Sequence, residues 1–265
     1  MNGHKMGLMS LMNNKLLALL SSCLVSFAAF GLDEEHHPVV SKTISLFQTM
    51  DIEEISNSVA YPLTRSYPIK DITNSAEFIK RFDEVFDSGF IQTLATSSLD
   101  DWQSMGWRGL RHVSGDFWID ISGKFLQIRH ETGLASRIKR EHITKDKARL
   151  HESVNDFERP VGKWQTESRL FRIDDLGEWS YRLVIWEDGK QFGDKPDVVL
   201  LNGVIEPDGS GGNRSFIFVD GNKTYIVNYG GISSESSPYG HFDILVDGDR
   251  AVEEEMWEKF PEILN

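Results

Sequence analysis

Two histidines of this chain lie in neighbouring predicted strands, with two aspartates between them in sequence. The residues are His112, His130, Asp116 and Asp120. An imidazole paired with a carboxylate can act as a general acid or base, because its pKa lies close to neutral pH. We therefore treat these four residues as the candidate catalytic set. The alternative is that both histidines have only a structural role in their strands.

A glycine-rich stretch, Asp208-Gly209-Ser210-Gly211-Gly212, superficially resembles the serine motif of trypsin-like proteases. A glycine stands between the aspartate and the serine, and no upstream histidine has a trypsin-like context. The glycines instead predict a tight loop between two strands. The oxygen-bearing residues of this loop lack EF-hand spacing, and the histidines form no spaced ligand set, so we expect no metal and no cofactor.

The first thirty-one residues have the layout of a secretory signal. Lys15 precedes an apolar run from Leu16 to Phe30 that ends at Gly31. The run is shorter than the roughly 20 residues of a membrane span, and translation can start at Met1 or at Met12. We expect cleavage after Gly31 and a periplasmic or secreted protein. Lipidation of Cys23 and an uncleaved anchor are the alternatives.

The charge of the chain limits its partners. The whole sequence has a net charge of −13, and the leader contributes two lysines and no acid, so residues 32–265 carry −15. This charge argues against nucleic acid and anionic lipid as partners, and no membrane contact is expected unless Cys23 is lipidated. It is compatible with a cationic protein partner, whereas solubility alone is the simpler explanation.

The N-terminal half shows helical periodicity. Val40, Ile44 and Phe47 recur at helical spacing, and Asp51 has the position of an N-cap. The clearest predicted helix begins at Asn74, with Glu77 completing a capping box. Its apolar face contains Phe78, Ile79, Phe82, Val85 and Phe86.

Strands are predicted after Trp102. Three segments are predicted strands, because they alternate apolar and polar positions or are bounded by turns: 107–113, 117–121 and 125–129. From Lys163 onward, about seven short strands are separated by turns such as Asp220-Gly221, a strong hairpin signal. This spacing predicts a small antiparallel β-barrel or sandwich. Residues 251–260 are predicted to form a closing helix anchored by Trp257.

A resemblance to a known group of proteins agrees with this order of elements. The N-terminal half resembles that of uncharacterised bacterial periplasmic proteins in which this half is NTF2-like (cystatin-like). The resemblance rests on the helix at 77–86 and on three segments: Tyr61-Pro62-Leu63, Asp71-Ile72 and Gly115-Asp116-Phe117-Trp118-Ile119. The C-terminal half is similar to the β-rich module of such proteins, on the following segments: Arg172-Ile173-Asp174, Tyr181-Arg182-Leu183, Lys195-Pro196-Asp197 and Gly209-Ser210-Gly211-Gly212-Asn213. The resemblance implies a fold and a compartment, and it assigns no catalytic residue.

The expected fold class is therefore α+β, with NTF2-like helices on a curved antiparallel sheet followed by a small β-barrel or sandwich. The expected domains are a signal peptide (1–31), an NTF2-like domain (32–135), a polar basic linker (136–160) and a β-rich domain (161–265). An NTF2-like domain can enclose an apolar cone, so Trp102, Trp107 and Trp118 are candidate ligand-binding residues. The same rings can simply fill the cone.

The function predicted first is binding without catalysis, because the sequence combines an export signal, an acidic composition and no recognisable catalytic constellation. The expected partner is another protein, on which this chain would act, for example, as an inhibitor or an immunity-type neutraliser. Two alternatives remain: small-molecule binding in the cone, and a hydrolase that uses a His/Asp pair.

Overall fold

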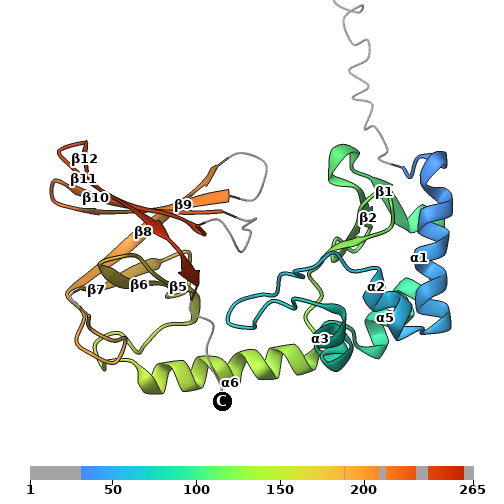
Figure 1. The fold of residues 1–265 in the computed structure, drawn as a ribbon, viewed down its shortest axis with the longest axis horizontal. Helices are drawn as coiled ribbons and strands as arrows, with labels where there is room; N and C mark the ends of the chain where they lie inside the picture. The colour runs from blue at the N-terminus through green and yellow to red at the C-terminus, as the bar shows by residue number, and fades with distance from the viewer. Residues whose placement is uncertain (1–30, 188, 209–212, 231–237, 260–265) are drawn as a thin grey trace, which may run out of the picture.

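The fold is known from a computed structural model that describes residues 31–187, 189–208, 213–230 and 238–259. It is α+β, as expected, with two halves joined by one long helix, α6 (Gly133–Arg149) (Figure 1). The predicted leader with Cys23 and residues 209–212 of the glycine-rich loop lie outside the described residues. Within these ranges, no helix combines the length and the apolar character needed to cross a membrane.

Short helices open the N-terminal half. They are α1 (His37–Thr49), α2 (Ile52–Asn57), α3 (Ser75–Lys80), α4 (Phe82–Val85) and α5 (Ser88–Ala95), with 3-10 turns at Glu34–His36, Leu99–Asp101 and Gly106–Arg108. Both predicted caps are confirmed: Asp51 accepts a hydrogen bond from the Glu54 amide (3.1 Å), and Asn74 accepts one from the Glu77 amide (2.9 Å). The single helix expected from Asn74 to Phe86 is wrong, because Arg81 leaves the helical conformation and divides it into α3 and α4.

A four-stranded antiparallel sheet completes this half, in the order β1-β2-β3-β4. The strands are β1 (Trp102–Ser104), β2 (Leu110–His112), β3 (Phe117–Ile119) and β4 (Phe125–Ile128). The strand expected at 107–113 therefore begins only at Leu110. Phe47 on α1 lies within 6 Å of three aromatic rings, Phe86, Phe117 and Phe125. Ile79 was expected in this core, but it is exposed because α3 turns it toward solvent.

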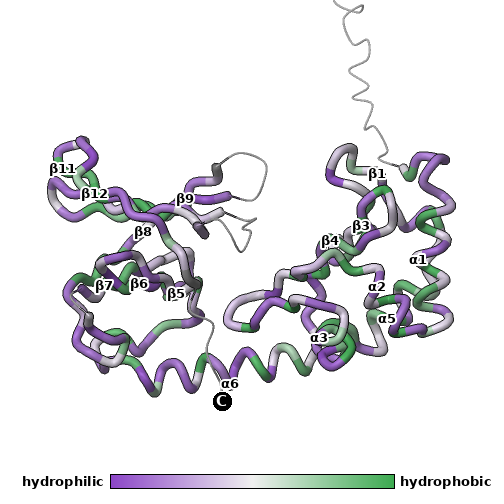
Figure 2. Tube along the Cα trace, in the orientation of Figure 1, coloured by the Kyte–Doolittle hydropathy of each residue, from purple (hydrophilic) through white to green (hydrophobic). Residues whose placement is uncertain are grey.

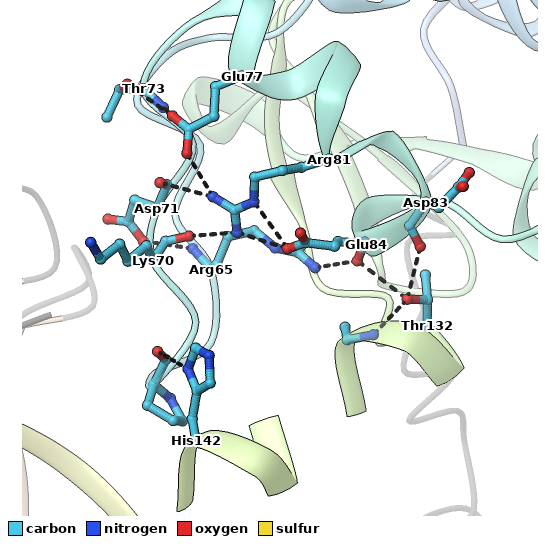
Figure 3. A network of polar contacts seen from close by, with 12 residues as sticks. Arg65, Lys70, Asp71, Thr73, Glu77, Arg81, Asp83, Glu84, Thr132 and His142 are labelled. Carbon is cyan, nitrogen blue, oxygen red and sulfur yellow. Dashed lines mark hydrogen bonds and ion pairs between the residues drawn. The ribbon is translucent and has the colours of Figure 1, made fainter. Parts of the chain in front are cut away.

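Polar contacts fix the loop 61–73 to α3 and α4 (Figure 3). The guanidinium of Arg81 donates hydrogen bonds to Glu77 Oε1 (2.8 Å) and Glu84 Oε2 (2.9 Å). It also donates to the carbonyl oxygens of Lys70 (3.0 Å) and Asp71 (3.3 Å), which belong to the loop. One half-buried cation therefore links two helices and a loop that has little regular structure of its own.

Helix α6 begins in the same region. Thr132 caps it by accepting a hydrogen bond from the Ala135 amide (3.0 Å), and its hydroxyl donates to the Asp83 carbonyl (3.2 Å). Further along α6, His142 Nδ1 lies 3.2 Å from the Pro68 carbonyl oxygen. These contacts fix the direction in which α6 leaves the N-terminal half (Figure 3). The helix includes most of the predicted linker, and it is mostly hydrophilic (Figure 2).

The C-terminal half is a curled antiparallel sheet in the order β12-β11-β10-β9-β8-β7-β6-β5-β13. Its strands are β5 (Arg159–Gln165), β6 (Arg169–Asp175), β7 (Tyr181–Glu187), β8 (Val198–Asp208), β9 (Asn213–Asp220), β10 (Lys223–Tyr229), β11 (Gly240–Val246), β12 (Asp249–Met256) and β13 (Glu258–Lys259). Strand β13 directly follows β12 and pairs with β5, so the two ends of the sheet meet. The closing helix expected at 251–260 is wrong, because its described residues, 251–259, pair with β11 and β5 as strands.

The two faces of the curled sheet differ. The inner face encloses an apolar core to which β5–β7 and β9–β12 both contribute, with Trp164, Phe171, Phe218 and Phe242 among the largest side chains. On the outer face, the last turns of α6 and the segment 150–157 cover strands β5–β7. Buried charges lie between helix and sheet: Asp146 of α6 contacts Lys163 and Arg172, and Asp174 pairs with Arg172 and Arg182.

Candidate interaction surface

The structure gives His112 a local partner. Its side chain is buried in the N-terminal half, and Nδ1 accepts a hydrogen bond from the Ser114 amide (3.2 Å) and lies 3.0 Å from Ser114 Oγ. Burial lowers the pKa of His112, which keeps the ring neutral at pH 7. His151 and Ser153 repeat the same contacts at 3.2 and 2.9 Å. Because the arrangement recurs at an unrelated turn, it is a feature of the turn.

His130 pairs with an aspartate that the sequence did not single out. Its Nε2 lies 2.9 Å from Asp87 Oδ2, and its ring stacks on Phe90 with 4.2 Å between centroids. Asp87 also caps α5 by accepting a hydrogen bond from the Phe90 amide (2.9 Å). The hydrogen bond to His130, followed by that cap, holds the pKa of Asp87 below its usual range. Within the described ranges, no hydroxyl group forms a hydrogen bond with this imidazole.

The two predicted aspartates hold turns. Asp120 Oδ1 accepts hydrogen bonds from the Ser122 amide (2.8 Å), the Ser122 hydroxyl (2.7 Å) and the Lys124 amide (2.9 Å). Burial alone would raise the pKa of Asp120, but these hydrogen bonds outweigh it and lower the pKa. Asp116 contributes backbone groups: its amide donates to Ser114 Oγ (3.2 Å). Neither carboxylate is brought into hydrogen-bond contact with His112 or His130.

The three predicted tryptophans lie in different environments. Trp102 is buried in the core, where its Nε1 donates to Ser97 Oγ (3.2 Å). Trp107 is 78% exposed, and Trp118 lies on the opposite face of the sheet from the core, with the Arg111 guanidinium 5.6 Å from its ring centre. A cleft of about 380 Å³ in this half lies between α1 and the β3–β4 turn, and none of the three lines it.

Near the start of the described chain, Asp33, Glu35 and His36 each offer one ligand atom within 4.8 Å of the others. Asp33 and Glu35 are exposed, and the His36 Nε2 to Glu35 Oε1 distance is 3.8 Å. The geometry allows weak binding of a divalent ion. Solvent-exposed acidic groups of this kind are common without one.

A different surface is distinguished by its residue types: the outer face of β8–β12. Residues directly opposite each other on antiparallel strands share a face. Strand pairing places Val204 opposite Ile217, Ile217 opposite Ile226, Ile226 opposite Asp243 and Asp243 opposite Glu253. These five side chains form one row across five strands, which we call the outer row.

Aliphatic side chains dominate one end of this face. Val204 is 54% exposed, and Ile217 and Ile226 are half-buried. Three further aliphatic residues of β8 and β9 are exposed nearby on these strands: Val199, Leu201 and Val219. On β5–β7 the corresponding face is covered by α6 and by residues 150–157, and among the described residues no comparable element covers β8–β10. Clustered exposed aliphatic residues mark interaction surfaces, whereas single ones are ordinary.

The other end of the outer row is acidic and contains an unusual carboxylate. Asp243 is only 3% exposed, although it belongs to the outer face. Its Oδ2 accepts a hydrogen bond from Asn228 Nδ2 (3.1 Å), and Asn228 Oδ1 accepts one from Ser215 Oγ (2.7 Å). Burial raises the pKa of Asp243, and the neighbouring Glu253 adds to this, while Arg250 opposes it.

Sequence reasoning missed this surface because its members are far apart in the chain. The aliphatic positions in β8, β9 and β10 were visible as strand residues, but no local pattern shows which of their faces stays open. Comparison of the chain with protein-family models, with curated proteins and with solved structures found no match.

Proposed function

We propose that this protein is exported to the periplasm or secreted, and that it functions by binding another protein through the outer face of β8–β12. The observation that carries this proposal is the exposed aliphatic cluster around Val204, Ile217 and Ile226. A soluble domain gains nothing in folding stability from leaving such side chains in water, whereas a partner that covers them gains roughly 25 cal/mol per Å² of apolar surface.

The finer details of the fold belong to the same proposal. The packing of helices α1–α5 against a small antiparallel sheet supports an NTF2-like assignment for the N-terminal half. The pairing of β13 with β5 supports a small β-barrel in the C-terminal half. The acidic composition supports a protein partner with cationic groups.

The interior of the N-terminal half favours protein binding over the small-molecule alternative. Phe47, Phe86, Phe117 and Phe125 pack ring against ring where a cone would be open. The local contacts of His112 and the pairing of His130 with Asp87 likewise give the hydrolase alternative little support.

The test compares capture of proteins from periplasmic extract by wild-type protein and two matched variants. Val204→Asp places a charge in the aliphatic cluster, and Val113→Asp is the control at a valine of similar exposure in the other half. We expect a stoichiometric partner that Val204→Asp loses and Val113→Asp retains. Capture of no partner under any condition, or equal capture by both folded variants, contradicts the proposal.

A further inference from the structure

Asp243 has an unmet hydrogen-bonding requirement. Among the described residues, its Oδ1 has no hydrogen-bond donor, and the nearest cationic atom, Arg250 Nε, is 3.7 Å away. The Arg250 side chain is more than half exposed, so solvent screens this contact. A buried carboxylate with one unsatisfied oxygen is costly, because desolvation is not offset by donors. Oδ1 itself has almost no solvent-accessible surface, so an additional donor reaches it only when the exposed Arg250 side chain moves aside.

The surroundings of Asp243 specify the charge of that donor. Glu253 lies directly opposite on β12, and Glu255 lies opposite His241 in the adjacent row. His241 has a buried Nδ1 that likewise has no hydrogen-bond partner in the described part of the chain. Arg250 already donates a hydrogen bond to Glu253 (2.9 Å). The carboxylates of Asp243, Glu253 and Glu255 still outnumber this cation, so this end of the outer row favours a further cation over another carboxylate.

Resting on the protein-binding function proposed above, we propose that Asp243 is the anchor for a lysine or arginine side chain of the partner, and that aliphatic residues beside this basic residue cover Val204, Ile217 and Ile226. The basic group donates to Oδ1. The partner segment is thus basic and aliphatic, and it lies across strands β8–β12.

The order of residues along the outer row makes this arrangement specific. The aliphatic members occupy β8, β9 and β10, the anchor occupies β11, and Glu253 occupies β12. A charge-assisted hydrogen bond in a desolvated place, surrounded by apolar contacts that exclude water, is the usual composition of an energetically dominant interface position. The aliphatic part provides contact area, and Asp243 fixes the register of the partner.

Displayed random peptides are the probe for this inference. Peptides are selected on the immobilised full chain, and their affinities are measured for wild-type protein and for Asp243→Asn, Val204→Asp and Asp249→Asn. Asp249 is an exposed aspartate on the neighbouring strand and serves as the matched control. We expect selected peptides to combine a lysine or arginine with aliphatic residues. We expect Asp243→Asn to weaken their binding at least tenfold, and Asp249→Asn to leave it unchanged.

A second measurement tests whether the basic residue of the peptide interacts with Asp243 itself. Replacing the basic residue of a selected peptide by glutamine has a large effect on binding to the wild-type protein and little effect on binding to Asp243→Asn, because the two changes remove one interaction. Thermal unfolding of Asp243→Asn at pH 7 is expected to occur at the same or a higher temperature than that of the wild type, which separates lost binding from lost folding.

The outcomes distinguish the inference from the function on which it rests. If Val204→Asp loses binding but Asp243→Asn does not, the proposed role of Asp243 as an anchor is wrong, and the proposed binding surface is retained. Selected peptides that lack a basic residue also overturn the anchor. Undiminished binding to folded Val204→Asp overturns the surface itself. If the wild-type protein sediments as a dimer and Val204→Asp sediments as a monomer, the surface binds a second copy of this chain. That result would contradict a basic segment of another protein as the partner.

Discussion

Asp146 Oδ2 lies 3.0 Å from Arg172 Nη1, and both side chains are almost completely buried. The other oxygen of Asp146 contacts the Lys163 ammonium. One carboxylate of α6 thus meets cations from two strands, β5 and β6. The aromatic rings of Phe157 and Phe192 lie over the two cations, which completes the enclosure of the network. The network joins the connecting helix to the sheet.

Replacing Asp146 is expected to weaken the C-terminal half strongly. In Asp146→Ala, Lys163 and Arg172 each lose a buried carboxylate partner, so the desolvation of these two cations is less well compensated. Loss of one partner of a buried ion pair costs about 3–5 kcal/mol. Chemical denaturation followed by circular dichroism measures this change in the free energy of unfolding.

The matched control is Asp156, a fully exposed aspartate 4.0 Å from Lys147. An exposed pair contributes little, so Asp156→Ala is expected to leave stability unchanged. Equal stabilities of the two variants would show that the buried network does not hold α6 against the sheet.

Gly203 is expected to tolerate no side chain. A Cβ at this position would lie 2.2 Å from Phe218 Cε1, and Phe218 is buried in the core of the curled sheet. Gly203→Ala must therefore displace a packed ring, at a cost of roughly 1–3 kcal/mol. The same substitution at Gly133, where nothing lies within 4 Å, is the control and is expected to be neutral or slightly stabilising. Thermal unfolding compares the two variants, and a neutral Gly203→Ala would contradict this packing.

The tryptophans differ in their expected contribution to stability. Trp102→Ala removes a buried indole from the N-terminal core and is expected to cost about 3–5 kcal/mol. Trp107→Ala removes a ring that is 78% exposed and is expected to change stability by less than about 0.5 kcal/mol. Acrylamide quenching of fluorescence gives an independent measurement, because only the Trp107→Ala variant loses a strongly accessible fluorophore. A large loss of stability in Trp107→Ala would place this ring in a core.

The stability gain of Asp243→Asn is expected to depend on pH. The folded-state pKa of Asp243 is raised, first by burial and also by Glu253, against the opposing effects of Arg250, His241 and the hydrogen bond from Asn228. The native state therefore binds a proton more readily than the unfolded chain, and stability falls as pH rises through this range. Relative to the wild type, the variant gains stability at pH 7. The gain disappears as the pH falls below the raised folded-state pKa toward the unfolded value of 3.8.

Paired denaturation curves of the two proteins, measured from acid to neutral pH, check this prediction. Taking the difference at each pH removes contributions from carboxylates that do not interact with Asp243. A difference that stays constant with pH, or one that grows toward acid pH, would contradict a raised pKa at this residue.

Local chemistry made several elements predictable. The caps at Asp51 and Asn74 depend on residues three positions apart, and the hairpin at Asp220-Gly221 depends on a positive φ that glycine adopts easily. The segment 251–260 shows the limit of such reasoning. Its glutamates favour a helix locally, but residues 251–259 pair with β11 and β5 as strands.

The sequence by itself determined the α+β class, the order of α1–α5 before β1–β4, and the acidic charge. Tertiary structure alone decided that His130 meets Asp87, 43 residues away, and that Val204, Ile217, Ile226 and Asp243 share one row. The reason is physical. A cap or turn is fixed by neighbours along the chain, whereas a row across a sheet is fixed by strand register. Register also decides which face is buried, because a shift of one residue turns every side chain of a strand to the other face.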